Sequence, residues 1–240
     1  MAEQKSIITP FTLLGYCSDP SLQLKCATNW IQNAVPVLPQ PLWSGTIYQH
    51  ERVRIAYLSA DFCQHATAYL MAELFELHDR TRFEVLGISF GTEDKSDIRA
   101  RIIESFDRFH DVRSKTDHEV AQLLTELQVE FAVDLKGYTR DARSGILTHR
   151  PAPIQVNYLG YPGTMGASFI DYVIADPIVL PFEQQPFYTE KIIQLPDCYQ
   201  VNDSRRKIGD RTPTRQESGL PDAGFVFCCF NNNYKNCDCV

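Results

Sequence analysis

The sequence predicts an α/β fold in which a mostly parallel β-sheet carries helices on both faces. Two observations predict this class. Short apolar runs of strand length alternate along the chain with longer stretches whose apolar residues recur at helical spacing. The 240 residues, 44% hydrophobic and 22% charged, are enough to bury the core of such a sheet. In sheets of this kind the functional loops follow the carboxyl ends of the strands.

Residues 1–50 are predicted to form one helix, which docks on the rest of the chain, and a connector. Asp19 suits the N-cap and Pro20 the first position of a helix over residues 19–33. Apolar residues then recur at helical spacing: Leu24, Ala27, Trp30 and Ile31. Three prolines within residues 36–41 exclude a helix there and indicate a linker.

Residues 51–200 are predicted to form the domain that holds the sheet. Its strands are expected at 53–59, 83–90, 129–135, 154–159 and 171–175. Three helices between them are recognised by apolar stripes: Leu70, Met71, Leu74, Phe75 and Leu77, then Ile98, Ile102, Ile103 and Phe106, then Val120, Leu123, Leu124 and Leu127. Thr116 and Glu119 have the spacing of a capping box that opens the third helix.

The chain changes character after this domain. Residues 201–223 are polar, charged and rich in turn formers, which predicts an exposed connector. Residues 225–230 are apolar and predict a strand, followed by a polar loop, so residues 224–240 have the pattern of a second domain at its start. A single strand cannot bury itself, and the rest of that domain is expected to be essentially missing.

Charge and hydropathy narrow the class of partner. A net charge of −7 argues against nucleic-acid binding, which needs a basic face to replace the phosphate counterions. No apolar stretch approaches the ~20 residues that span a bilayer, and the first residues, MAEQKSIITPF, lack the apolar core of a signal peptide. The chain is therefore expected to be cytoplasmic and to bind neither nucleic acid nor membranes.

The eight cysteines do not form a metal-binding pattern. Cys17, Cys26, Cys63 and Cys198 are isolated, Cys228 and Cys229 are adjacent, and Cys237 and Cys239 lie at the C-terminus. No pair of them has the two-residue spacing of a zinc ribbon. Reduced thiols are expected. The chain also lacks an Asp-x-Asp pair that would hold a divalent cation on a nucleotide diphosphate, so diphosphate chemistry would rely on lysine, arginine or helix N-termini.

The first loop with possible chemistry is residues 61–65, between the first strand and the first helix of the sheet domain. If that helix begins at Ala66, His65 lies at its N-terminus, where the helix dipole disfavours the imidazolium form. A neutral imidazole there could act as a general base. The alternative is a polar loop residue that caps the helix or fills space.

Two further loops follow strands. Residues 136–140 contain Lys136 and Gly137 and form a cationic turn that could meet an anionic or sugar ligand. The alternative is a plain turn in which Gly137 supplies backbone freedom. Residues 159–166 contain three glycines and a proline, which let the backbone approach a ligand closely or simply make a tight turn. Neither this loop nor residues 59–64 (SADFCQ), which come at the end of the first strand, have a Walker or G-x-G-x-x-G pattern. The absence of these patterns disfavours a Rossmann dehydrogenase.

Four segments resemble the catalytic region of the protein O-GlcNAc transferases, especially the bacterial members. They read RVRIAYLSADFCQHATAYLM, VDLKGYTRDARSGIL, HRPAPIQVNYLGYPGTMGASFIDYVIAD and FVFCCFNNNYK. The stretch PFTLLGYCSDPSLQLKCATNW resembles the junction between the tetratricopeptide array and the catalytic core of that family. The resemblance implies a GT-B architecture, with two Rossmann-like lobes and the active site between them, of which this chain is the N-terminal lobe.

The resemblance also implies a reaction. N-acetylglucosamine passes from UDP-GlcNAc to a serine or threonine hydroxyl of a protein, with inversion and without a metal or other cofactor. His65 matches the active-site histidine of the DF-x-x-H-x-x-x-x-LM motif, as the base or as a residue that positions the acceptor. Tyr234 and Lys235 match a Y-K pair in which the lysine steadies the diphosphate; without that match Lys235 would be taken for a surface lysine. The expected sugar and acceptor pocket comprises Thr67, Lys136, Gly137, Tyr138, Leu159, Gly160, Pro162, Gly163 and Thr164.

The chain departs from the family pattern at both ends. No repeat of ~34 residues is found, so at most the tail of the tetratricopeptide array remains. After Lys235 the sequence NCDCV replaces an apolar-periodic helix, which suggests an interrupted or shortened reading frame. Without a second lobe the donor site lacks a pocket wall, so little or no transferase activity is expected from the isolated chain. The alternative function is a non-catalytic, single-lobe protein-interaction module.

Overall fold

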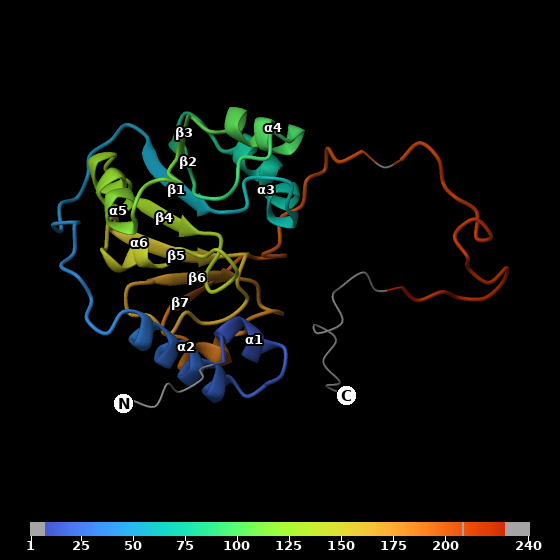
Figure 1. Ribbon diagram of the computed structural model, residues 1–240, viewed down its shortest axis with the longest axis horizontal. Coiled ribbons are helices and arrows are strands. Elements are labelled where there is room, and N and C mark those ends of the chain that lie inside the picture. The colour runs from blue at the N-terminus through green and yellow to red at the C-terminus, as the bar shows by residue number, and fades with distance from the viewer. Residues whose placement is uncertain (1–7, 208, 229–240) are drawn as a thin grey trace. The chain divides into compact units, whose positions relative to one another are not determined.

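The computed structural model describes residues 8–207 and 209–228 and divides the chain into a unit that ends at Asp203 and a unit that begins at Ser204 (Figure 1). No helix or strand occurs among the described residues of the second unit. Of the strand predicted at 225–230, residues 225–228 are not in a strand, and 229–230 lie outside the described residues. The domain boundaries drawn from the sequence stay predictions.

The first unit contains a seven-stranded sheet in which every neighbouring pair of strands is parallel, in the order β3-β2-β1-β4-β5-β6-β7. The strands are β1 (Val53–Ser59), β2 (Phe83–Ser89), β3 (Arg108–Asp111), β4 (Phe131–Asp134), β5 (Ile154–Tyr158), β6 (Tyr172–Ala175) and β7 (Lys191–Gln194). The predicted parallel α/β fold is confirmed, with all five predicted strands in place.

In the part of the chain that the structure describes, six α-helices and one 3-10 helix accompany the sheet. They are α1 (Pro10–Leu14), α2 (Pro20–Ala34), α3 (Ala66–Leu77), α4 (Asp97–Ser105), α5 (Asp117–Glu126), α6 (Gly145–Thr148) and η1 (Phe182–Phe187). The capping box at Thr116 and Glu119 is present. Among residues 8–207 and 209–228, no helix combines the length and the apolar character that a membrane span requires.

Two apolar clusters lie on opposite faces of the sheet, as the prediction of helices on both faces requires. Ala56 and Leu58 of β1 face a cluster that includes residues of α2, α5 and α6, whereas Tyr57 faces one that includes residues of α3 and α4. Figure 1 shows α5 and α3 on either side of β1. Two residues assigned to the apolar stripes, Leu77 and Ile103, are exposed instead. Leu77 is the last residue of α3, and Ile103 lies on a different side of α4 from the buried Ile102.

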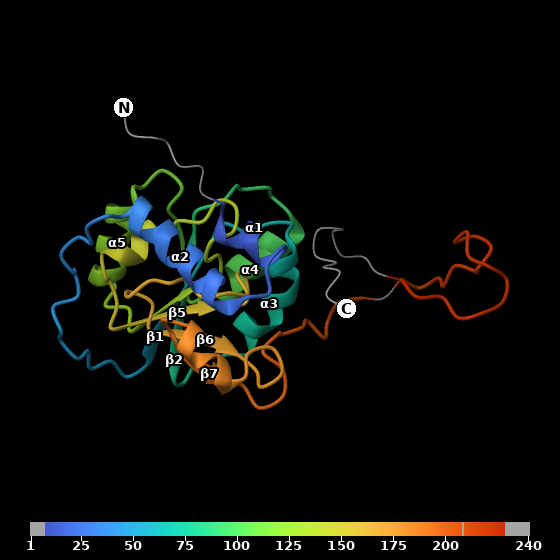
Figure 2. The same ribbon diagram turned by 90° about the horizontal axis from the view of Figure 1, so that it is seen from below.

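The N-terminal helices pack on the loops of the sheet. The predicted helix over 19–33 is confirmed as α2, and Asp19 caps it by accepting hydrogen bonds from the N–H groups of Ser21 and Leu22. A Cβ built on Gly166 would lie 2.5 Å from the backbone nitrogen of Thr28, so α2 meets the loop after β5 backbone to backbone. The shorter helix α1, which the sequence did not reveal, lies beside α2 (Figure 2).

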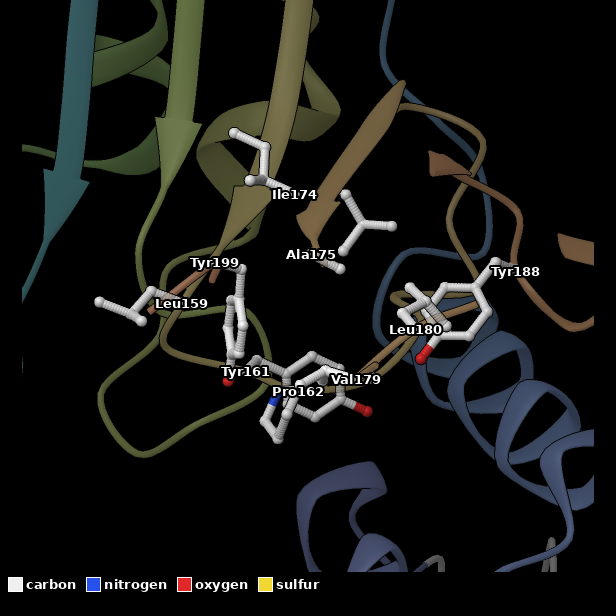
Figure 3. A pocket seen from close by; sticks show the side chains of 11 residues that line it. Leu159, Tyr161, Pro162, Ile174, Ala175, Val179, Leu180, Tyr188 and Tyr199 are labelled. Carbon is white, nitrogen blue, oxygen red and sulfur yellow. The ribbon is translucent and has the colours of Figure 1, made fainter. Parts of the chain in front are cut away.

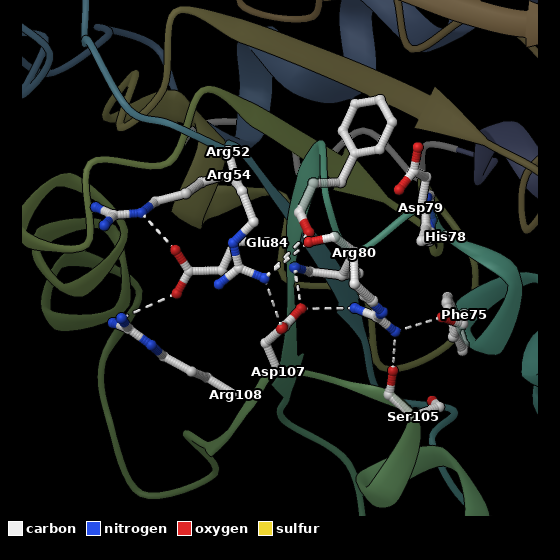
Figure 4. A network of polar contacts seen from close by, with 12 residues as sticks. Arg52, Arg54, Phe75, His78, Asp79, Arg80, Glu84, Ser105, Asp107 and Arg108 are labelled. Atoms are coloured by element: carbon white, nitrogen blue, oxygen red, sulfur yellow. Dashed lines mark hydrogen bonds and ion pairs between the residues drawn. The ribbon is translucent and has the colours of Figure 1, made fainter.

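A network of arginines and acids joins the amino-terminal ends of β1, β2 and β3 (Figure 4). Glu84 of β2 forms ion pairs with Arg54 of β1 and Arg108 of β3, each at 2.9 Å. Asp107 forms ion pairs with Arg52 at 3.0 Å and with Arg80 at 2.6 Å. These contacts stabilise the end of the sheet opposite to the loops that carry the candidate site.

Candidate functional site

The strand order reverses beside β1. The chain runs outward from β1 to β2 and β3, then returns to place β4 on the other side of β1. The carboxyl ends of β1 and β4 are adjacent, with Leu58 paired to Asp134. In open α/β sheets this switch point is where ligands bind. The loops after β1, β4 and β5, which the sequence singled out, therefore lie next to one another.

Close contacts hold these three loops together. The Nζ atom of Lys136 lies 2.6 Å from Oδ2 of Asp61, which joins the loop after β4 to the loop after β1. A Cβ on Gly137 would lie 2.3 Å from Cβ of Tyr161, and a Cβ on Gly160 would lie 1.9 Å from the carbonyl oxygen of Leu135. The loops after β4 and β5 thus meet at distances that only glycine permits.

His65 is the N-cap of α3, so the predicted helix start at Ala66 is confirmed. Its Nδ1 atom accepts a hydrogen bond from the N–H of Thr67 at 3.2 Å and lies 3.5 Å from Oδ2 of Asp61. The side chain is 47% exposed. The imidazole is therefore within reach of a ligand while one edge of its ring is held by the protein.

Lys136 lies inside the site. Its side chain is only 5% exposed, and its ammonium is paired with Asp61. The buried carboxylate of Asp134 shapes the same turn by accepting the N–H groups of Lys136 at 2.8 Å and Gly137 at 3.2 Å. Burial raises the pKa of Asp134 to about 6, against the lowering effect of these two N–H groups and of the Lys136 charge.

Two hydroxyl groups of the predicted pocket are used within the protein. Tyr138 donates to the carbonyl of Met165 at 2.6 Å, and Thr164 donates to Glu190 at 2.7 Å. The other oxygen of the Glu190 carboxylate accepts the N–H of Met165 at 2.5 Å, and burial raises the pKa of this carboxyl group. These contacts hold the loop after β5 and leave both hydroxyl groups engaged within the protein.

A small cavity of about 40 Å³ lies beside the loop after β5 (Figure 3). Leu159, Pro162 and Gly163 line it together with Tyr188 and Tyr199. Leu159 has φ +63°, a left-handed conformation that is strained for a branched side chain. Strain of this kind gathers at functional sites, where the surrounding structure enforces it.

Three residues that support the His65 loop were not identified from the sequence. Asp61 lies beside the imidazole, Asp94 accepts the N–H of Gln64 at 2.6 Å, and the buried Arg99 donates to the carbonyl of Phe62 at 2.7 Å. Asp61 belongs to the DF-x-x-H motif identified in the sequence. Its contact with Lys136 could not be predicted, because the two residues are far apart in the chain and no local sequence pattern indicates such a pair.

The two remaining predicted residues, Tyr234 and Lys235, lie outside the described residues. Within the described part of the chain, no group of three or more His, Cys, Asp or Glu side chains is positioned to hold a metal ion. The roles assigned to the site residues stay predictions.

Comparisons with known proteins agree on one family. The model of Glycosyl transferase family 41 matches residues 39–212. The chain is 34% identical over 95% of its length to the Arabidopsis thaliana protein named probable UDP-N-acetylglucosamine–peptide N-acetylglucosaminyltransferase SEC, and it covers 25% of that protein. It is 33% identical, over 68% of its length, to the UDP-N-acetylglucosamine–peptide N-acetylglucosaminyltransferase of Caenorhabditis elegans and covers 14% of it.

A solved structure shows the same fold. A mutant of the Thermobaculum terrenum O-GlcNAc transferase matches with a TM-score of 0.70 and 28% identity, over 79% of this chain and 37% of the other. The chain thus spans about a quarter or less of the length of these two relatives and about a third of the solved structure.

Proposed function

Because this chain belongs to glycosyl transferase family 41, we propose that it takes part in the transfer of N-acetylglucosamine from UDP-GlcNAc to serine or threonine hydroxyls of proteins. The relatives named above as peptide N-acetylglucosaminyltransferases support this donor and this class of acceptor. The proposal includes a cytoplasmic location and no role for nucleic acid or membranes, in keeping with the acidic net charge.

One observation carries the proposal. The half-exposed imidazole of His65 stands at the switch point of the sheet, beside the loops after β4 and β5. In the proposed mechanism the acceptor hydroxyl attacks the anomeric carbon and its proton passes to His65, directly or through an ordered water. Proton transfer of this kind contributes on the order of 10²–10⁴ in rate.

Two hydroxyl groups of the proposed pocket are not free to bind the sugar, because those of Tyr138 and Thr164 are bonded within the protein. Leu159, Gly160, Pro162 and Gly163, on the loop after β5, are proposed to line the pocket for the sugar and the acceptor. Charge that develops on the departing UDP would be offset by Lys235, next to Tyr234, and by N–H groups at helix starts, without a metal.

We further propose that residues 1–240 expressed alone have little transferase activity, because they supply one sheet unit.

A second candidate function, a non-catalytic interaction module, is favoured by exposed apolar side chains after β6. Ile178 is 88% exposed, and Val179 and Phe182 are each more than half exposed. Side chains of this kind, when gathered, mark surfaces that bind other proteins.

Donor binding separates the two candidates. Titration of UDP-GlcNAc into the chain, labelled with ¹⁵N at its histidines, is expected to move the His65 signal, identified by its loss in His65→Gln. The ligand also stabilises the fold, by about 2.7 kcal/mol at one hundred times its dissociation constant. If UDP-GlcNAc changes neither the histidine signals nor the melting temperature, the transferase proposal is wrong and the interaction module is favoured.

A further inference from the structure

The Nδ1 atom of His65 lies between two partners that require different protonation. The backbone N–H of Thr67 is 3.2 Å away and donates to Nδ1. The carboxylate oxygen Oδ2 of Asp61 is 3.5 Å from the same atom and can only accept.

These two contacts select opposite tautomers of the neutral ring. A bond from Thr67 needs the lone pair of Nδ1, which places the single ring proton on Nε2. A bond to Asp61 needs the proton on Nδ1, which leaves the lone pair on Nε2. Because a neutral imidazole carries one ring proton, both cannot form at once, and only the second tautomer presents Nε2 as a base.

The carboxylate of Asp61 is held in place for this contact. Its side chain is 13% exposed, and the same Oδ2 atom accepts a hydrogen bond from the buried ammonium of Lys136 at 2.6 Å. Lys136 is fixed in turn, because its backbone N–H binds Asp134. The pull of Asp61 on the imidazole is therefore weakened by a cation that the fold positions.

Other charged or titratable groups on this loop act on its backbone or are thiols. Asp94 accepts the N–H of Gln64, and Arg99 donates to the carbonyl of Phe62. Cys63 has a pKa raised by burial and by the nearby carboxylates of Asp94 and Asp61, so its thiol is neutral near pH 7. Asp61 and Lys136 are thus the pair that acts on the ring.

We propose that Asp61 is a positioning residue that selects the Nδ1–H tautomer of His65, and that Lys136 limits how strongly it does so. The inference rests on the proposed role of His65 as the base. In this inference the carboxylate of Asp61 determines which of two tautomers His65 adopts. In one tautomer Nδ1 caps α3, and in the other Nε2 can accept a proton as the base.

The test is ¹⁵N NMR of the histidine-labelled chain at neutral pH, with the His65 signals identified by their loss in His65→Gln. In Asp61→Asn the amide can donate toward Nδ1, so the fraction of the Nδ1–H tautomer is expected to fall. In Lys136→Met the carboxylate loses its cation, so that fraction is expected to rise. Asp94→Asn, which alters a carboxylate that holds the same loop by its backbone, is expected to leave the fraction unchanged.

The opposite directions distinguish positioning from a general loss of structure, which would move both variants the same way. If Asp61→Asn does not fold, the double variant Asp61→Asn/Lys136→Met removes the buried ammonium and is expected to show the same fall. An unchanged fraction in Asp61→Asn or in the double variant, or a shift of the same sign in Lys136→Met, overturns the inference. A tautomer that responds as expected in a chain that binds no UDP-GlcNAc would uphold the positioning and reject the proposed function.

Discussion

The ammonium of Lys136 lies 2.6 Å from the carboxylate of Asp61, so an ion pair joins the loop after β4 to the loop after β1. Both side chains are largely buried, at 5% and 13% exposure. Ion pairs of this kind are costly to break, because the partner that remains keeps a charge without its counter-ion. The pair therefore bears on the stability of the site as well as on its chemistry.

Asp61→Asn is expected to lower the free energy of unfolding by on the order of 3 kcal/mol, because Lys136 keeps a buried charge. Adding Lys136→Met should recover much of this loss, which urea unfolding of the four proteins in a double-mutant cycle would measure. The exposed Arg140 serves as the control, and Arg140→Gln should cost less than about 1 kcal/mol. A loss in the double variant equal to the sum of the two single losses would mean that the pair is not coupled.

His65→Ala is expected to remove both the helix cap and the proposed base, whereas His65→Asn removes only the base. Asparagine is a good N-cap, so it should retain stability that alanine loses, about 1 kcal/mol by thermal or urea unfolding. The small turnover of UDP-GlcNAc proposed for residues 1–240 alone should fall to background in both variants. Turnover that persists in His65→Asn would contradict the assignment of His65 as the base.

Asp107 is expected to make the fold sensitive to acid. Burial alone would raise the pKa of Asp107, but the N–H of Val85 and the guanidinium groups of Arg52 and Arg80 outweigh it and lower that pKa. A carboxyl group with a lowered folded-state pKa contributes stability above its unfolded pKa, near 3.9, and loses it as pH falls through the folded value. Unfolding measured from about pH 5 downward should show a shallower decline in Asp107→Asn than in wild type or in the exposed-site control Asp141→Asn.

Asp134 is expected to act with the opposite sign. Burial raises its pKa to about 6, so the folded state holds this proton more tightly than the unfolded state does. Its contribution to stability therefore decreases as pH rises from about 4 to about 6 and is constant above that range. Asp134→Asn, whose amide oxygen can still accept an N–H of the turn, should remove this slope. A slope retained in the variant would show that another group causes it.

Gly166→Ala is expected to displace α2 from the sheet unit. A Cβ there would lie 2.5 Å from the Thr28 nitrogen, and the position also has φ +58°, so a loss of about 2–4 kcal/mol in the free energy of unfolding is expected. Gly45 is the matched control: its φ is +88°, but a Cβ there meets nothing within 4 Å. Gly45→Ala should cost only the backbone strain, about 1 kcal/mol. Equal costs would mean that α2 yields freely to the added methyl group.

Much of the fold could be predicted from the sequence because its central strands are uninterrupted apolar runs. β1 and β2 are buried over most of their length, and their sequences are correspondingly rich in apolar residues. The edge strands β3 and β7 were missed, since each is exposed at two of its four positions and neither is a continuous apolar run. The strand expected at 225–230 is absent over 225–228, where Phe225 and Phe227 are exposed: an apolar run forms a strand only where a sheet receives it.

The candidate site was predictable in part. The loops after β1, β4 and β5 were identified by their position after strands, and the strand order brings them together. What the sequence did not reveal is how their side chains are used. Lys136 turns inward to Asp61, and the hydroxyls of Tyr138 and Thr164 bond to Met165 and Glu190. Such pairings depend on contacts between segments far apart in the chain, which spacing does not encode.

The docking of α2 has a consequence for how the chain behaves when it is cut. The segment between α2 and β1 is mostly exposed and contains neither helix nor strand, while α2 is fastened at its far side by Gly166 and by the ring of Trp30 against Tyr138. A protease that nicks residues 36–41 would therefore sever the backbone without releasing the helix. The two pieces would remain a non-covalent complex, and a peptide of the first 35 residues could complement the remainder.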